Sequence, residues 1–158
     1  MQKSRRSIPK VFLTSLFAFA LLIPVAYAQS ASTAKTGDWG IVIQKKDISS
    51  TAKFYPYTVN DKPMEVFAVK ASDGTIRTAL NTCQVCYSSG RGYYKQQGNV
   101  LVCQNCGNRF SVDQIELIKG GCNPVPILGK DKADLGDSIG ISRAYLTSMA
   151  PYFARWKK

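Results

Sequence analysis

The sequence predicts an α+β fold: a mostly antiparallel β meander and hairpins, with zinc-ribbon-like cysteine knuckles and a C-terminal helix. Three observations predict it. Short runs rich in aromatic and β-branched residues alternate with turn residues, two Cys-x-x-Cys pairs follow such runs, and large apolar residues at helical spacing close the chain. The 158 residues are enough for one modest domain.

Residues 1–28 have the composition of an export signal. Basic residues precede the apolar run VFLTSLFAFALLIPVAYA, which ends in a small-residue A-x-A cleavage site. An uncleaved N-terminal membrane anchor is the alternative, because the run is about long enough to span a bilayer. The segment SRRSIPK resembles the twin-arginine export consensus, and an ordinary secretory signal is the competing interpretation. We therefore expect an exported protein, in the periplasm or on the extracytoplasmic face of the membrane.

The absence of histidine excludes several kinds of site. Cys₂His₂ zinc sites, Rieske centres and Ser–His or Cys–His catalytic pairs all need an imidazole. The formal charge of +11 becomes +7, from 17 basic and 10 acidic residues, if residues 1–28 are removed. Because the basic residues are scattered, we expect a soluble basic surface and no nucleic-acid partner. No small-molecule substrate is evident.

The first part of the domain reads as a meander. Residues 29–47 form a small polar linker followed by one candidate edge strand at 39–43. Three further runs predict antiparallel strands joined by turns at Asn60-Asp61 and at Ser72-Asp73-Gly74: 53–59, 64–71 and 75–80. Pro56 favours an edge strand or a bulge, because proline cannot donate to a strand ladder.

The second part carries a hairpin and helices. Residues 93–96 and 100–103 predict a hairpin that delivers the second cysteine pair. Residues 111–119 predict one or two helical turns capped by Ser111 and ended by a Gly-Gly pair. The final segment, 129–158, is expected to be a loop over 129–141 and then an amphipathic helix capped by Ser142 and broken at Pro151. Four residues recur at helical spacing and predict a core-facing stripe: Tyr145, Met149, Phe153 and Trp156.

The five cysteines are the candidate site residues: Cys83, Cys86, Cys103, Cys106 and Cys122. Two Cys-x-x-Cys pairs separated by 16 residues can bring four thiolates onto one ion, which suits zinc, a single iron or an iron–sulfur cluster. Gly107 supports such a turn, because a knuckle needs a residue that tolerates positive φ. Two disulfides and a spare thiol are the alternative in an exported chain. Bridged Cys-x-x-Cys pairs are usually strained and redox-active, which weakens that alternative.

Three blocks in order, DGTIRTALNTCQVCY, GRGYYKQQGNVLVCQNCGNRF and KGGCNPVPI, resemble the FtrD-like membrane iron–sulfur protein family over about residues 48–128. The resemblance implies an iron–sulfur redox module outside the cytoplasmic membrane with all five cysteines as cofactor or metal ligands. It also implies redox or iron-transport partner proteins at the membrane, among them a copper-dependent iron oxidase and an iron permease. Many members carry a multi-helix membrane portion ahead of this domain, whereas only the signal-like segment precedes it here.

The resulting hypothesis is an exported iron–sulfur or single-iron electron-transfer protein rather than an enzyme, accessory to ferrous-iron uptake or other metal handling. Two alternatives stay open: a non-catalytic zinc-binding structural or assembly module, and a periplasmic carrier of Cu(I) or zinc. Four aromatic residues are expected either to shield the centre from water or to pack as local core: Tyr87, Tyr93, Tyr94 and Phe110.

Overall fold

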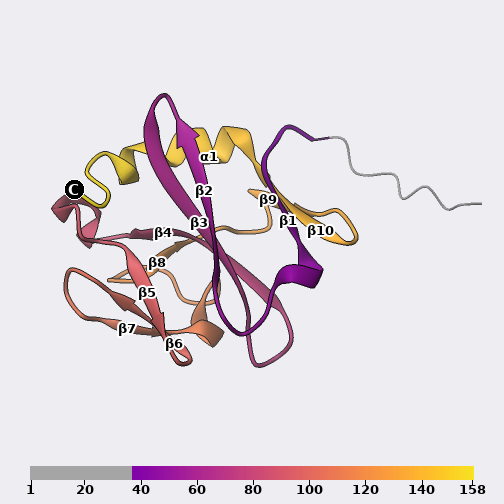
Figure 1. Cartoon of the computed structure of the whole chain (residues 1–158), viewed down its shortest axis with the longest axis horizontal. Coiled ribbons are helices and arrows are strands. Elements are labelled where there is room, and N and C mark those ends of the chain that lie inside the picture. Colours follow the sequence, from indigo (N-terminus) through magenta and orange to yellow (C-terminus); the bar gives the residue numbers. More distant parts are fainter. Residues whose placement is uncertain (1–36) are drawn as a thin grey trace, which may run out of the picture. The chain divides into compact units, whose positions relative to one another are not determined.

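The computed structural model describes residues 37–158. The expected export signal or anchor, residues 1–28, and most of the linker after it lie outside the described residues. The described part consists of three antiparallel sheets, short 3₁₀ turns and one α-helix near the C-terminus (Figure 1). This confirms the expected α+β fold with mostly antiparallel strands. Over the same residues, no helix has both the length and the apolar character needed to cross a membrane.

The central sheet has the order β2-β3-β4-β8. Its strands are β2 (Lys53–Val59), β3 (Lys62–Lys70), β4 (Ile76–Cys83) and β8 (Pro124–Pro126). The predicted meander and its turns are therefore confirmed. Asn60 and Asp61 both have positive φ, 47° and 60°, as a two-residue hairpin turn that follows the strand twist requires. Pro56 lies on the edge strand β2, as predicted, because an edge strand has one side without ladder hydrogen bonds and so tolerates proline.

A second sheet has the order β1-β10-β9, from β1 (Trp39–Gln44), β10 (Ser138–Ser142) and β9 (Lys132–Asp134). The predicted edge strand is confirmed as β1. The expectation of a loop over 129–141 was wrong, because this segment supplies both β9 and β10. Its short glycine- and lysine-containing runs carry little strand signal. They become strands because Ile139 pairs with Ile43 of β1, almost a hundred residues away in sequence.

The third sheet, β5-β6-β7, carries the second cysteine pair. The predicted hairpin is confirmed as β5 (Tyr94–Gln97) and β6 (Val100–Cys103), and β7 (Arg109–Ser111) was not predicted. After it, the Ser111 hydroxyl accepts a hydrogen bond from the Asp113 N–H and caps a single 3₁₀ turn, η3 (Val112–Gln114). The helix goes no further, because Glu116 has a φ of 68°.

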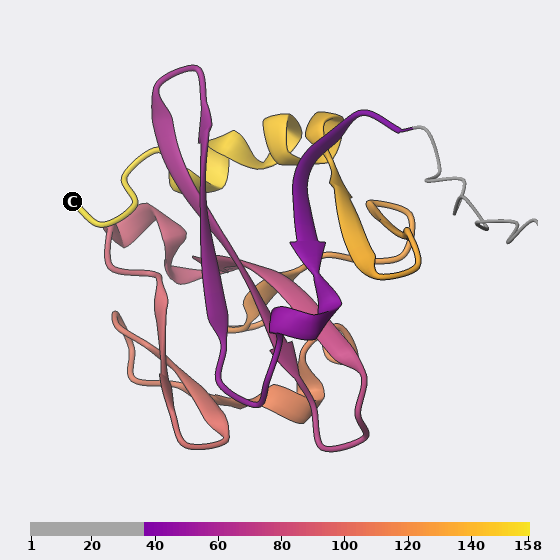
Figure 2. The ribbon, with the colours of Figure 1, turned by 45° about the vertical axis from the view of Figure 1, so that its right-hand side comes forward.

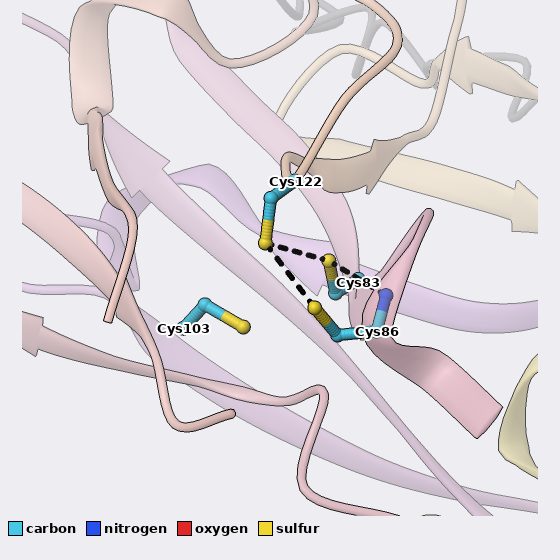
Figure 3. A group of neighbouring side chains, drawn as sticks. All are labelled: Cys83, Cys86, Cys103 and Cys122. Atoms are coloured by element: carbon cyan, nitrogen blue, oxygen red, sulfur yellow. Dashed lines mark hydrogen bonds between the residues drawn. The ribbon is translucent and has the colours of Figure 1, made fainter. Parts of the chain in front are cut away.

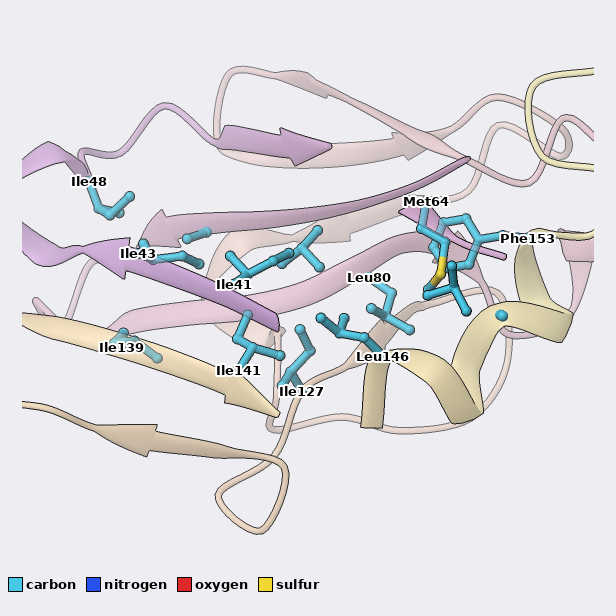
Figure 4. Close-up of a cluster of buried hydrophobic side chains, with 14 residues drawn as sticks. Ile41, Ile43, Ile48, Met64, Leu80, Ile127, Ile139, Ile141, Leu146 and Phe153 are labelled. Carbon is cyan, nitrogen blue, oxygen red and sulfur yellow. The ribbon is translucent and has the colours of Figure 1, made fainter. Parts of the chain in front are cut away.

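The chain ends in α1 (Arg143–Met149) and the 3₁₀ turn η4 (Ala150–Phe153). Ser142 caps α1 by accepting from the Tyr145 N–H, and α1 gives way to a second short helix with Pro151 in its first turn, so both predictions are confirmed. The predicted stripe packs on one core between the first two sheets and the helix. Its most buried members include Ile43, Val66, Leu80, Ile141, Leu146 and Phe153. Figure 4 shows the buried side chains of this core, Phe153 of the stripe among them.

A second core lies between the central sheet and the third sheet. Its buried members come from β3 to β7 and the segment after them, and include Phe67, Tyr94, Leu101, Phe110 and Ile115. Figure 2 shows the two sheets from another side, with β5, β6 and β7 in salmon. Cys83 and Cys103 belong to this core, whereas Cys86 and Cys122 pack at its margin. The fold therefore places the cysteines where a buried core meets solvent.

Candidate metal centre

The ends of two strands and one loop bring the five cysteines together. Cys83 is the last residue of β4 and Cys103 the last residue of β6. Cys86 begins the 3₁₀ turn η2 (Cys86–Ser89), Cys106 lies in the turn after β6, and Cys122 lies in the loop before β8. We call residues 83–86 the first knuckle and residues 103–106 the second knuckle. All five are free thiols.

Four of the sulfurs form a compact group (Figure 3). The Sγ atoms of Cys83, Cys86, Cys103 and Cys122 all lie within 4.8 Å of one another. The Cys122 Sγ lies 3.2 Å from that of Cys83 and 3.5 Å from that of Cys86. Metal–sulfur bonds of about 2.3 Å in a tetrahedron separate the sulfurs by about 3.8 Å. The group therefore has the dimensions of the coordination sphere of one ion.

Cys106 lies on the solvent side of this group. Its side chain is exposed, and its Sγ lies 2.7 Å from the Cys122 Sγ without belonging to the four-sulfur group. Sequence spacing alone pairs the two knuckles as the four ligands and leaves Cys122 to complete or tune the site. In the structure Cys122 is the most central sulfur, in contact with the sulfurs of Cys83, Cys86 and Cys106.

Backbone geometry shapes both knuckles. In the first, the Cys86 N–H donates to the Cys83 Sγ at 3.3 Å, an interaction that stabilises a thiolate. In the second, the Gly107 N–H donates to the Cys103 carbonyl at 2.9 Å, and Gly107 has a φ of 74°, as its predicted role requires. Gly92 is needed for a different reason, since a Cβ there would lie 2.5 Å from the Cys86 carbonyl group.

The two knuckles are joined by the strand that lies between them. The Cys83 N–H donates to the Gly92 carbonyl at 2.6 Å, and the Gln104 N–H donates to the Tyr93 carbonyl at 2.8 Å. The Tyr94 N–H that follows donates to the buried Asn81 side chain on β4 at 2.7 Å. These bonds fix the end of β4 relative to the end of β6, and so fix the sulfurs that they carry.

The Cys122 loop is anchored at the cysteine itself. Its carbonyl accepts hydrogen bonds from the Tyr94 hydroxyl and the Asn108 amide, both at 2.9 Å. The Gln84 N–H of the first knuckle donates to the neighbouring Asn123 carbonyl at 3.1 Å. The loop is thus tied to both knuckles.

A partly buried ion pair anchors the same loop further upstream. The Glu116 carboxylate accepts from the Thr78 N–H and hydroxyl at 2.5 and 2.8 Å, and lies 2.5 Å from the Lys132 ammonium. The two charged side chains are only 15% and 16% exposed. Sequence reasoning missed Asn108, Glu116 and Lys132, because no motif marks them and their roles exist only once distant segments meet.

Hydrogen bonds and burial give the thiols unequal acidity. Burial raises the pKa of Cys103 to about 11, and burial, followed by hydrogen bonds donated to neighbouring sulfurs, raises the pKa of Cys122. The hydrogen bond from Cys122 is the main cause that lowers the pKa of Cys106 to about 7. At Cys83 burial acts to raise the pKa, but hydrogen bonds from Tyr94, the Cys86 N–H and Cys122 together lower it. The site thus favours thiolates on two of its sulfurs, which is the form that binds a cation.

The aromatic residues divide into two groups. Tyr94 and Phe110 are buried and pack in the same core as Cys83 and Cys103, as a water shield requires. Tyr93 is half-buried, with the Lys157 ammonium 5.4 Å from its ring centroid. Tyr87 is 37% exposed and packs against Tyr152 rather than over the sulfurs. Two of the four expected shielding residues therefore cover the site.

An antiparallel domain whose strand ends gather four sulfurs around one point belongs to the class of proteins that can hold a cysteine-ligated metal centre. The chain belongs to the family described as membrane iron-sulfur containing protein FtrD-like, whose model matches residues 40–153. The match extends beyond the residues 48–128 that carry the cysteine blocks. The all-sulfur donor set and its burial fit an iron or iron–sulfur group.

The other comparisons with known proteins do not identify the chain further. A search of curated protein sequences found no match. Among solved structures, the chain is similar to the crystal structure of the quaternary ammonium Rieske monooxygenase CntA in complex with inhibitor MMV12, at 14% sequence identity and a TM-score of 0.45. The similarity covers 67% of this chain and 31% of that one.

Proposed function

We propose that this protein transfers electrons through a sulfur-ligated iron centre, either a single iron or an iron–sulfur cluster. One observation carries the proposal. Four sulfurs lie within 4.8 Å of one another at the margin of a buried core, in a chain that belongs to an iron–sulfur family. When bound, the iron group supplies a one-electron redox couple.

The residues of the chain have separate roles in this proposal. Cys83, Cys86, Cys103 and Cys122 hold the metal, and the exposed Cys106 is an exchangeable fifth sulfur beside Cys122. The Cys86 N–H spreads negative charge away from the Cys83 sulfur, and the buried ring of Tyr94 excludes water. Hydrogen bonds to sulfur and exclusion of water are the means by which a protein sets the potential of such a centre.

The cellular setting is also proposed. The signal-like residues 1–28 and the family support export to the periplasm or the extracytoplasmic face of the membrane. There the protein would work with redox or iron-transport proteins in ferrous-iron uptake or other metal handling. Cell fractionation, together with the mass of the mature N-terminus, tests the export and the cleavage after Ala28. A full-length chain in the cytoplasm would contradict both.

A structural zinc module is the second candidate. Its support is the size of the four-sulfur group, which fits the about 2.3 Å bonds of a tetrahedral zinc as it stands. In that function the metal stabilises the fold and no electron is transferred.

Anaerobic purification followed by metal and acid-labile sulfide analysis separates the candidates. Visible absorption with iron and sulfide supports a cluster, and iron without sulfide supports a single-iron site. A colourless protein with one zinc per chain overturns the redox function, and bound Cu(I) points instead to a metal carrier. The Cys83→Ser/Cys103→Ser double variant is the control, because it removes one sulfur from each knuckle and should lose the metal.

A further inference from the structure

Exposed apolar side chains gather at the cysteine-bearing segments. Over residues 37–158 the exposed large hydrophobic residues are Val42, Val85, Tyr87, Leu117 and Ile118. Four of these five lie in the first knuckle, directly after it, or in the loop that leads to Cys122. Val85 is 60% exposed and Leu117 is 64% exposed, although neither side chain is needed to bind a metal. Water-exposed apolar groups at a functional site are typical of a surface that a partner covers.

Hydrogen bonds hold these segments side by side. The Gly120 N–H donates to the Gln84 side chain at 3.2 Å, and the Gln84 N–H donates to the Asn123 carbonyl at 3.1 Å. In Figure 3 the sulfurs of Cys86 and Cys122, one from each segment, face each other. Val85 lies in the first knuckle, and Leu117 and Ile118 lie in the loop that leads to Cys122. We call Val85, Leu117 and Ile118 the site face.

The charged residues within the cysteine-bearing segments 74–112 and 117–130 are all basic. No aspartate or glutamate occurs in residues 74–112 or 117–130, which include all five cysteines. Exposed basic residues in these segments are Arg91, Lys95, Arg109, Lys119 and Lys130. None of the five takes part in an ion pair within the described part of the chain. The basic residues around the sulfurs are thus left without acidic partners of their own.

The C-terminal tail adds two more exposed basic residues. We call Arg91, Arg109, Lys119, Arg155 and Lys158 the basic rim. The Lys157 N–H donates to the Gly90 carbonyl at 2.8 Å, so the tail lies against the turn after the first knuckle (Figure 1). The exposed side chains of Arg155 and Lys158 come with it. The Arg91 guanidinium donates to the Gln104 carbonyl at 3.2 Å and so ties the segment after the first knuckle to the second knuckle.

We propose that the site face with its basic rim is the docking surface for a one-electron redox protein with an acidic surface. This inference rests on the proposed electron-transfer function. The apolar site face excludes water from between the two redox sites. The basic rim orients an acidic partner before contact. A protein partner is favoured over an anionic lipid surface because the centre beneath must exchange an electron, and a lipid headgroup can accept none. One electron leaves the reduced iron centre and reduces the metal of the partner, and no covalent bond changes.

Stopped-flow kinetics with two probe proteins test the docking surface. The reduced, as-purified protein is mixed with an acidic plastocyanin or with a basic cytochrome c over a range of ionic strength. We expect the rate with plastocyanin to fall steeply with salt, and the rate with cytochrome c to change little or to rise. Arg91→Glu/Lys119→Glu should lower the plastocyanin rate at low salt by roughly tenfold or more. Lys62→Glu/Lys70→Glu carries the same change of net charge on exposed residues of β3, away from the cysteines, and should not.

The apolar centre is tested separately. Leu117→Ser/Ile118→Ser should lower the plastocyanin rate at high salt, where steering is screened, while the visible spectrum stays unchanged. Equal effects of the two charge-reversal variants, or plastocyanin rates independent of salt, would overturn the inference. So would loss of binding to phosphatidylserine vesicles in Arg91→Glu/Lys119→Glu without any change in the plastocyanin rate, since that result assigns the face to a membrane.

A readout that needs no redox chemistry separates this inference from the proposed function. Carbodiimide crosslinking to plastocyanin should join Lys119 to carboxylates of the probe and leave Lys62 unmodified. A colourless zinc protein that still crosslinks through Lys119 would overturn electron transfer and keep the docking face. A coloured, redox-active protein that crosslinks equally at both lysines would keep electron transfer and overturn the docking face.

Discussion

The Cys122 sulfur lies 3.2 Å from the Cys83 sulfur, although 39 residues separate the two in the sequence. This contact brings the fifth cysteine into the group that the first knuckle begins. It also leaves Cys106, the last residue of the second knuckle, at the solvent side. The sulfurs that meet at the site are therefore set by the end of β4 and by the loop before β8 as much as by the two Cys-x-x-Cys pairs.

Removing Cys122 should lower the metal content per chain more than removing Cys106. Cys122→Ser takes a sulfur from the four-sulfur group, whereas Cys106→Ser takes one outside it. We expect Cys122→Ser to lose most of its iron during purification and Cys106→Ser to keep it. Metal content per chain and the visible spectrum measure the difference. The opposite order would show that the two knuckles alone bind the metal.

Tyr94→Phe should lower the reduction potential of the centre by tens of millivolts without unfolding the protein. The Tyr94 hydroxyl donates to the Cys122 carbonyl and lowers the pKa of the nearby Cys83 thiol, so losing this hydroxyl leaves the ligand sulfur richer in electrons. The phenyl ring keeps the packing. Redox titration followed by absorption gives the shift. Tyr93→Phe is the matched control, since no sulfur contact involves the hydroxyl of this half-buried neighbour in the described structure.

Glu116→Gln should lower the free energy of unfolding by about 2–3 kcal/mol, because it leaves the Lys132 ammonium, 16% exposed, without its counter-charge. This loss lies at or below the low end of the range for breaking a fully buried ion pair, because water still reaches both charged side chains. Urea unfolding with an unchanged m-value measures it. Lys45→Met is the control, because the pair of Lys45 with Asp134 is 31% and 71% exposed and should contribute less than about 1 kcal/mol. Equal losses in both variants would show that burial does not distinguish the pairs.

Asn81→Ala should destabilise the protein by about 1–3 kcal/mol, because it leaves the buried Tyr94 N–H without an acceptor. The same side chain donates to Glu65 of β3 at 2.6 Å, and its bond with the Tyr94 N–H links β4 to β5. The variant therefore also loosens the strands that position the two knuckles. We expect faster iron loss to a chelator alongside the lower midpoint of urea unfolding. The exposed Gln114→Ala should change neither. If the Asn81→Ala variant is less stable but retains its iron normally, Asn81 supports the fold and does not position the metal site.

Much of the fold could be predicted because its signals are local. The meander follows from β-branched and aromatic runs between turn residues, and both Ser111 and Ser142 act as the caps that their positions indicate. The strands β9 and β10 could not be predicted, since their short runs are strands only while β10 pairs with β1. The helical turns expected over 111–119 shrink to one, because Ile115 has an extended ψ of 136° and Glu116 a positive φ of 68°.

The sequence by itself determined the chemistry of this protein. Five cysteines and no histidine restrict the site to sulfur, and the spacing of the two knuckles indicates a metal. Tertiary structure decided which sulfurs meet, because the position of Cys122 depends on hydrogen bonds from Tyr94 and Asn108, and the Glu116–Lys132 pair fixes the loop further upstream. It also decided which apolar and basic side chains surround the centre. Ligand type is a property of single residues, whereas ligand distance and surface depend on contacts between segments far apart in the chain.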